Sequence, residues 1–378
     1  MHRGILACWT LLVLGVVSAI PQTVSAAAGQ TRNVFLITAD GLRWQEVFRG
    51  AEDFPLTKEF GNSGSSNAIA KLYHRPTPAQ RRQALMPFLW NTVAAQGQIW
   101  GNRDLGSEVR VRNGHNFSYP GYNEFLTGYP DPAVTSNDKI LNANTNVFEW
   151  LNRLPGFQGR VAAAVNWDVL PWILNAPRAG FPVWSGFEVP SGTERLPVPA
   201  ALTEIVERGR TVWSGVLLDS FVGYAAKHAV RTLNPRAMYV SFGETDDWAH
   251  EGHYERYLRA VSEFDRFLGE LWDLVQSIPQ YRGNTTFFIT CDHGRGPIPV
   301  AWRNHGKEIA DSAYIWFAVI GPDTPALGER SKTPLCTQSQ VAATIAELVG
   351  ENFHGAFPQS GASLGELVIA PKGAGASR

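Results

Sequence analysis

The sequence predicts an α/β fold with a doubly wound, largely parallel central sheet and helices on both faces. Three observations lead to this prediction. Several short runs are continuously apolar and β-branched, as in strands that are buried on both faces. Segments with an apolar stripe at helical spacing lie between these runs. Asp or His lies within a few residues of the end of several runs, where a parallel sheet presents its carboxyl edge.

The first predicted strand, residues 33–39, reads NVFLITA and ends at the turn sequence Asp40-Gly41. Residues 236–242 and 285–290 have the same character and are likewise followed by acidic residues. The complete set of predicted strands is 33–39, 107–112, 161–165, 236–242, 285–290 and 315–320.

The longest predicted helix, residues 253–275, is charged on one side and carries Leu258, Val261, Phe264 and Leu268 on the other. Residues 51–78 and 175–215 are rich in Pro and Gly, which predicts loop insertions that decorate one face of the sheet. The predicted helices are 79–96, 119–127, 146–152, 217–232, 253–275 and 338–349.

The composition is that of a folded protein without a nucleic-acid platform. Of 378 residues, 44% are hydrophobic and 18% charged, which allows a buried core and excludes wholesale disorder. Lys plus Arg number 33 and Asp plus Glu 34, so no basic excess exists to bind a phosphate backbone. Three cysteines cannot make a disulfide framework. We therefore expect a small-molecule substrate, and the oligomeric state stays open.

The N-terminus has the layout of a cleavable signal peptide, residues 1–26. A basic start at Arg3 precedes an apolar run over residues 5–20, and Val24-Ser25-Ala26 offers small residues for cleavage. The alternative is a membrane anchor, but the run is shorter than the about 20 residues that a span needs.

We expect a secreted or periplasmic protein with no membrane span in the mature chain. It consists of one α/β domain, residues 27–370, and a disordered tail, residues 371–378. The mature chain keeps Cys291 and Cys336, and whether they pair is left open.

Candidate metal ligands follow the predicted strands. Ligands of open α/β sheets bind beyond the carboxyl ends of the strands, and the side chains expected there are Asp40, Asp246, His250, Asp292 and His293, with His305 in a later loop. Any one of them has an ordinary interpretation as a turn, a cap or a solvated side chain. Together, carboxylates and imidazoles at one edge favour a site for Zn²⁺ or Mn²⁺.

The order of these motifs resembles the alkaline phosphatase superfamily, in particular the nucleotide pyrophosphatase/phosphodiesterase branch. Asp40-Gly41-Leu42-Arg43 matches the first metal motif of that branch. The segment from Ser118-Tyr119-Pro120 to Thr127-Gly128 is similar to its nucleophile segment. The resemblance extends over residues 33 to about 350 and implies an alkaline-phosphatase-like fold.

The resemblance implies a role for each matching residue. Asp246, His250 and His305 would hold one divalent ion, while Asp40, Asp292, His293 and the oxygen of Ser118 would bind the other. Ser118 would be the nucleophile, activated by the metal, and would form a phosphoseryl intermediate. The implied function is a secreted hydrolase of phosphoric esters, either monoesters or diesters, with two divalent ions, Zn²⁺ or as an alternative Mn²⁺.

Several assignments stay open within this resemblance. Asp247 is adjacent to Asp246 and is an alternative ligand, although the spacing of four residues to His250 favours Asp246. The branch has an Asn that contacts the phosphoryl group, and Asn137, Asn142 and Asn144 are candidates for it. Gly121 and Tyr122 replace the branch's Asn and His, so the resemblance does not assign the substrate pocket.

Three other functions compete with phosphoric ester hydrolysis. A phosphomutase of the Mn²⁺-dependent type shares the ligands, but a signal peptide would separate it from cytosolic sugar phosphates. A sulfatase would have Arg four residues after the nucleophile, where this chain has Tyr122, and sulfatases favour Ca²⁺ with oxygen ligands. A non-catalytic extracytoplasmic binding protein on the same scaffold would lack a ligand or the nucleophile, and all seven positions are filled. Residues 167–213, rich in Trp and Pro, would line an aromatic pocket or pack on the surface.

Overall fold

The fold is built on a mixed, mostly parallel sheet of eight strands. The computed structural model describes residues 1, 29–52, 72–209 and 211–368. In spatial order the strands are β10 (Gly328–Glu329), β2 (Gln98–Trp100), β9 (Phe317–Ile320), β7 (Thr285–Thr290), β1 (Asn33–Ala39), β6 (Ala237–Phe242), β4 (Val161–Val165) and β5 (Val183–Trp184). The predicted fold class is confirmed.

The parallel part of the sheet runs from β7 through β1, β6 and β4 to β5, and β9 is antiparallel to both of its neighbours. Val34 of β1 pairs with Ala237 on one side and Thr286 on the other. Every residue of β1, β4, β6 and β7 is buried. Burial on both faces explains why these strands read as continuous apolar runs.

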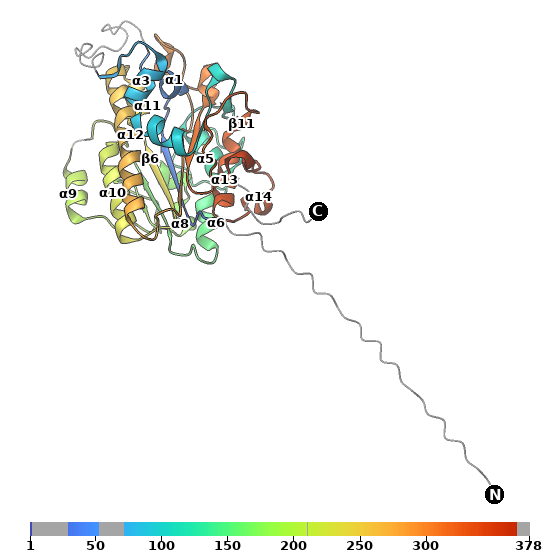
Figure 1. Ribbon diagram of the computed structural model, residues 1–378. Helices are drawn as coiled ribbons and strands as arrows, with labels where there is room; N and C mark the ends of the chain where they lie inside the picture. The colour runs from blue at the N-terminus through green and yellow to red at the C-terminus, as the bar shows by residue number, and fades with distance from the viewer. Residues whose placement is uncertain (2–28, 53–71, 210, 369–378) are drawn as a thin grey trace.

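Helices cover both faces of the sheet (Figure 1). One face carries α10 (Asp219–Thr232) and α12 (Tyr254–Ser277), and the other carries α5 (Ser118–Thr127), α6 (Val147–Arg153) and α13 (Val341–Leu348). The predicted stripe of α12, including Leu258, Val261, Phe264 and Leu268, is buried. Its solvent side is charged, so burial of one stripe holds this helix on the molecule.

The remaining elements are short and connect or cap these layers. A second sheet has the order β11 (Cys336–Thr337), β3 (Val109–Arg110) and β8 (Tyr314–Ile315). The other helices are α1 (Trp44–Arg49), α3 (Pro78–Leu85), η1 (Leu89–Val93), α4 (Ala94–Gln96), η2 (Arg103–Leu105), α7 (Leu170–Ile173), α8 (Ala176–Ala179), α9 (Ala200–Arg208), α11 (Glu244–His250), η3 (Ala301–Arg303), η4 (Ala310–Ala313), η5 (Gln338–Gln340), α14 (Phe353–Ala356) and η6 (Gly365–Leu367).

Several predicted elements differ from the structure. The helix expected over residues 79–96 is divided into α3, η1 and α4, and the strand expected over residues 107–112 is reduced to β3. The single strand expected over residues 315–320 is divided at Trp316, so that β8 and β9 belong to different sheets. The buried indole of Trp316 donates to the carbonyl of Leu42 at 3.0 Å, a contact that the local pattern cannot reveal. The expected insertion over residues 175–215 contains α8, α9 and β5, and β5 extends the main sheet by pairing with β4.

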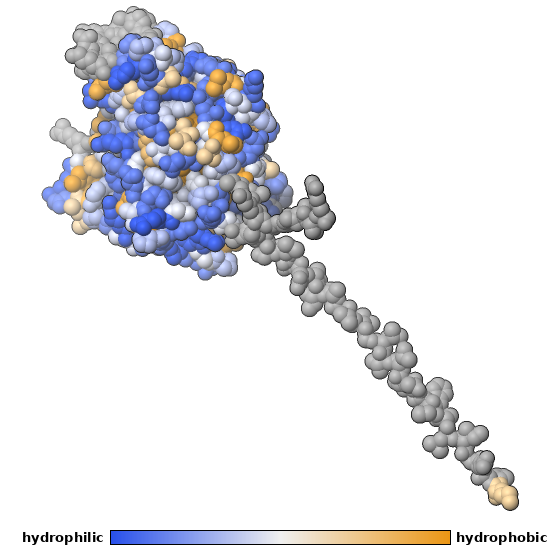
Figure 2. Space-filling model, in the orientation of Figure 1, coloured by the Kyte–Doolittle hydropathy of each residue, from blue (hydrophilic) through white to orange (hydrophobic). Residues whose placement is uncertain are grey.

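The predicted signal peptide and tail lie outside the described residues, apart from Met1. In the part of the chain that is described, no helix is long and apolar enough to cross a bilayer. The visible face in Figure 2 is mainly hydrophilic, with apolar residues scattered over it. Cys291 and Cys336 are both free and buried. The division into one domain stays a prediction.

Candidate metal centre

Three adjacent parallel strands bring the predicted ligands to one edge of the sheet. Asp40 follows β1, Asp292 and His293 follow β7, and α11, which begins one residue after β6, carries Asp246 and His250. Because β7, β1 and β6 are neighbours and parallel, their carboxyl ends meet at this edge. The predicted strand-end residues therefore lie together, although they are far apart in the sequence.

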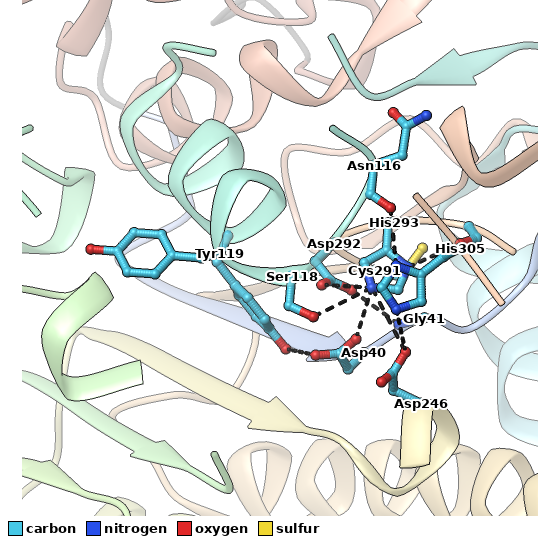
Figure 3. Close-up of polar contacts among 12 residues, drawn as sticks. Asp40, Gly41, Asn116, Ser118, Tyr119, Asp246, Cys291, Asp292, His293 and His305 are labelled. Carbon is cyan, nitrogen blue, oxygen red and sulfur yellow. Dashed lines mark hydrogen bonds and ion pairs between the residues drawn. The ribbon is translucent and has the colours of Figure 1, made fainter. Parts of the chain in front are cut away.

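The first group of donors consists of Asp40, Asp292 and His293, all buried. One ligand atom from each lies within 4.8 Å of the others. His293 Nε2 is 3.3 Å from Asp40 Oδ1 and 3.4 Å from Asp292 Oδ2 (Figure 3). His293 Nδ1 is 2.9 Å from the carbonyl of Gly294. A carbonyl only accepts, so Nδ1 donates to it, and Nε2 is directed to the same place as the two carboxylates, where a cation would bind all three.

The second group consists of Asp246, His250 and His305. Helix α11 places Asp246 and His250 on one face, with Asp246 Oδ2 3.2 Å from His250 Nε2. His250 Nε2 and His305 Nε2 are 2.9 Å apart. His305 Nδ1 lies 3.2 Å from the carbonyl of Asn116, which fixes its tautomer, and burial lowers the pKa of His305 well below its usual value. Asp247, the alternative ligand, is not part of this group.

Both groups fit a divalent cation. Asp40 Oδ1 and Asp292 Oδ2 are buried oxygens without a hydrogen-bond partner among the described residues. Burial, with the charge of Asp246 or Asp40 in addition, raises the pKa of Asp40 and Asp292 well above the usual range. Unpaired carboxylates in such a place are costly unless a cation compensates them. Neutral imidazoles with carboxylates form the donor set that Zn²⁺ prefers.

Ser118 lies next to the first group. It is the first residue of α5, after the extended Phe117, and its Oγ is 3.4 Å from His293 Nε2. Figure 3 shows Ser118, Asp40, His293 and Asp246 pointing toward one another. Gly121 allows this approach, since a Cβ there would lie 2.4 Å from the carbonyl oxygen of Asp292. The close packing of α5 on the residues that follow β7 thus positions the hydroxyl.

Tyr122 and Arg295 support the ligands, and the sequence did not reveal either role. The Tyr122 hydroxyl donates to Asp40 Oδ2 at 2.9 Å. The guanidinium of Arg295 pairs with Asp246 Oδ1. Burial raises the pKa of Asp246, but Arg295, His250 and His305 together outweigh burial and hold this pKa well below the usual range. Tyr122 lies one helical turn after Ser118, and this spacing was the sequence signal that could have placed it near the site. The branch has His where this chain has Tyr122. Because Tyr122 is fully buried, this replacement affects the support of Asp40.

We expect Tyr122→Phe to weaken metal binding by about 10- to 100-fold, because it removes a hydrogen bond that orients Asp40. Competition with a chromogenic chelator measures this affinity. Tyr119→Phe is the matched control on the same helix, since the Tyr119 hydroxyl donates to the carbonyl of Ile140. Equal metal affinity in the two variants would show that the Tyr122 hydroxyl does not support the site.

Of the three candidate asparagines, the structure places Asn137 beside Ser118. Asn137 and Ser118 line one cavity, which is described below, and Asn137 Oδ1 accepts from the backbone N–H of Tyr119 at 2.9 Å. Asn142 and Asn144 instead donate to Asn123 Oδ1 at 3.0 and 3.2 Å. The amides of Asn142 and Asn144 are thus occupied in fixing the loop to α5.

The cavity at this edge has a volume of about 180 Å³. Ligands from both groups line it, together with Ser118 and Asn137, and Asn166, Trp167 and Asp247 form a further part of its wall. A larger cavity of about 480 Å³, between α10 and α12, is lined by none of the predicted ligands. The small cavity is therefore the candidate active site.

Comparison with known proteins supports this choice. Residues 223–350 match the model of a family described as the Metalloenzyme superfamily, a segment that contains five of the six predicted Asp and His ligands. The fold is similar to a phosphonate monoester hydrolase from Silicibacter pomeroyi, at 14% identity and TM-score 0.52, over 92% of this chain and 78% of that one. This family match and the shared fold support the predicted alkaline phosphatase superfamily.

Two further proteins are similar to this chain. The murine ectonucleotide pyrophosphatase/phosphodiesterase 5 in complex with AMP has TM-score 0.50 and 12% identity, over 85% of this chain and 96% of that one. The 2,3-bisphosphoglycerate-independent phosphoglycerate mutase of Synechococcus sp. (strain JA-2-3B'a(2-13)) is 25% identical over 200 residues. The match covers 49% of this chain and a third (33%) of that mutase. The superfamily implies divalent metal ions, and the two donor groups can hold them.

Proposed function

We propose that this protein is a two-metal hydrolase of phosphoric esters with Ser118 as its nucleophile. The observation that carries the proposal is the convergence of two donor groups and one buried hydroxyl in a single cavity. Asp40, Asp292 and His293 would hold one ion with Ser118, and Asp246, His250 and His305 would hold the other. Similarity to the phosphodiesterase branch supports diesters or monoesters as substrates.

The bound ions would lower the pKa of the serine hydroxyl and neutralise charge on the phosphoryl oxygens. The chain's own residues provide the geometry. Ser118 Oγ is held at the start of α5, in a first turn where the N–H of Tyr119 donates to Asn137 Oδ1 and Pro120 has no N–H. Asn137 lies beside it to donate to a phosphoryl oxygen. Attack by Ser118 on phosphorus would expel the alcohol and leave a phosphoseryl enzyme that water hydrolyses.

A sulfatase is the second candidate from the same superfamily. Two observations favour the phosphoric ester. Tyr122 occupies the position of the sulfatase Arg, and its hydroxyl is directed to Asp40. Three imidazoles among the six Asp and His ligands favour transition metals over the oxygen-ligated Ca²⁺ of sulfatases.

Metal analysis and an ester panel test this proposal together. We expect close to two Zn²⁺ or Mn²⁺ per chain, with hydrolysis of p-nitrophenyl phosphate or its bis-ester abolished by EDTA and restored by metal. Occupancy is expected to fall below about pH 6, because protons compete for the same imidazoles and carboxylates. Full activity after long incubation with excess EDTA would contradict the mechanism, and hydrolysis of only the sulfate ester would favour the sulfatase.

We further infer that the protein is exported by the signal peptide of residues 1–26. The basic start, the apolar run and the small residues before the cleavage point support this. N-terminal sequencing of the exported protein should begin at Ala27. Recovery of the protein in the membrane fraction, with Met1 still present, would favour a membrane anchor instead.

A further inference from the structure

Asn166 has a buried side-chain amide that has been given no role in the site described above. It directly follows β4, the neighbour of β6, and lines the cavity that contains Ser118. Its side chain is almost fully buried, at 1% exposure for the residue. Neither Nδ2 nor Oδ1 has a hydrogen-bond partner within the described part of the chain. Buried amides are normally satisfied, so this one indicates a missing partner.

The surrounding backbone holds the main chain of Asn166 and leaves room for its side-chain amide. The carbonyl of Asn166 accepts from the N–H of Leu217 at 2.9 Å. Its side chain lies against Gly243, where a Cβ would come within 2.1 Å of Nδ2. Gly243 begins the turn that leads into α11 and Asp246. The absence of a side chain at Gly243 therefore makes room for the amide beside the ligands.

The hydrogen-bonding groups of the amide limit the kinds of ligand that can satisfy it. An amide offers both a donor and an acceptor, whereas an ionised phosphoryl group only accepts. A phosphoryl group alone would therefore leave Asn166 Oδ1 without a donor. A hydroxyl donates and accepts, and it satisfies such a group. Asp247, on the same wall, can accept from a second hydroxyl, and the partly exposed ring of Trp167 offers a flat apolar surface beside it.

We propose that Asn166, with Asp247 and Trp167, forms a subsite for a hydroxyl-bearing alcohol portion of the ester, such as a polyol or sugar. This proposal rests on the proposed function, since it assigns the leaving group of the same reaction. The volume of about 180 Å³ is below the usual range for whole ligands. The cavity thus takes the phosphoryl group and the first hydroxylated carbons, and the rest of the substrate extends into solvent.

Binding measurements without turnover test the subsite. Calorimetry on the metal-loaded Ser118→Ala protein compares glycerol 1-phosphate with propyl phosphate, which has the same phosphate and chain length without the two hydroxyls. We expect glycerol 1-phosphate to bind at least about tenfold more tightly, which corresponds to about 1.4 kcal/mol. Adding Asn166→Leu should reduce this ratio to about twofold by weakening glycerol 1-phosphate alone. Equal affinities before the second substitution, or no measurable binding of glycerol 1-phosphate, would overturn the proposal.

The controls separate a binding role from a structural one. Asn166→Leu should not lower the melting temperature, because the amide it removes has no partner in the protein. Asn142→Leu removes a buried amide that is hydrogen-bonded, so it should lower the melting temperature and leave the affinity ratio unchanged. If the leucine variant does not fold, Asn166→Ala provides the same comparison. Equal weakening of both esters by Asn166→Leu or Asn166→Ala would overturn the subsite.

Turnover by the intact enzyme distinguishes the two proposals. Hydrolysis through Ser118 without any preference for the hydroxylated ester would overturn the subsite and leave the proposed function in place. A binding preference that depends on Asn166, in a wild-type protein that hydrolyses no phosphoric ester, would overturn the proposed function and keep the subsite.

Discussion

Replacing Ser118 with alanine is expected to lower turnover by on the order of a thousandfold or more, as nucleophile deletions do in other hydrolases. At least one metal should remain bound, because three Asp and His donors of each group are untouched. Ser118→Thr should keep part of the activity, since it retains a hydroxyl and adds only a methyl group. Acid quenching of the wild type during turnover should trap phosphate on the peptide that contains Ser118.

The alternative for Ser118 is a helix cap, whose loss costs only about 1 kcal/mol of stability. The structure disfavours it, because Phe117 is the N-cap and makes no side-chain capping bond, while Ser118 is already the first helical residue. Ser136→Ala is a suitable control, since the hydroxyl of Ser136 pairs with Asp138 in an exposed turn. Near-normal turnover of Ser118→Ala, with no trapped phosphopeptide, would remove Ser118 from the reaction.

Asp292→Asn and His305→Ala are expected to abolish binding of one ion each and, with it, nearly all activity. Asp292 gives a particularly clean test. Its Oδ1 accepts from the N–H of Gly41 at 3.0 Å, a bond that asparagine can keep, whereas its Oδ2 has no hydrogen-bond partner in the described chain. The substitution thus removes the negative charge and the free oxygen, and the apolar strands maintain the fold.

Metal content by mass spectrometry and the circular dichroism spectrum measure this outcome. Asp247→Asn is the matched control, because Asp247 is the acidic neighbour that lies outside both donor groups. It should keep both ions. Wild-type metal content in Asp292→Asn or His305→Ala would show that the residue is structural, and loss of an ion in Asp247→Asn would make Asp247 the ligand instead of Asp246.

The strand-end pattern predicted much of the candidate site. Asp40, Asp292 and His293 follow strands that are buried on both faces, and such strands keep continuous apolar runs whatever packs on them. The bounds of residues 33–39, 161–165 and 285–290 were accordingly predicted to the residue. The resemblance then divided the ligands into the same two groups that the structure brings together. Their roles as ligands stay predictions.

Short elements and supporting contacts were not predictable in this way. The two residues of β5 carry no periodicity and form a strand only because β4 offers a free edge. Trp316 divides an apolar run, and its indole donates to the carbonyl of Leu42, which is distant in the sequence. Asn166 follows a predicted strand and was within reach of the same rule, but an amide at a strand end has too many ordinary uses to be selected from the sequence.

The sequence by itself determined the central strands and the order of the chemical motifs, and it indicated the superfamily, because burial and turn geometry leave local patterns along the chain. Tertiary structure alone decided which side chains support those motifs. Tyr122 supports Asp40, Arg295 pairs with Asp246, and Asn137 reaches Ser118, whereas Asn142 and Asn144 do not. These assignments depend on distances between segments up to 82 residues apart, and a hydrogen bond between such segments is fixed only when the packing of the helices on the sheet sets their separation.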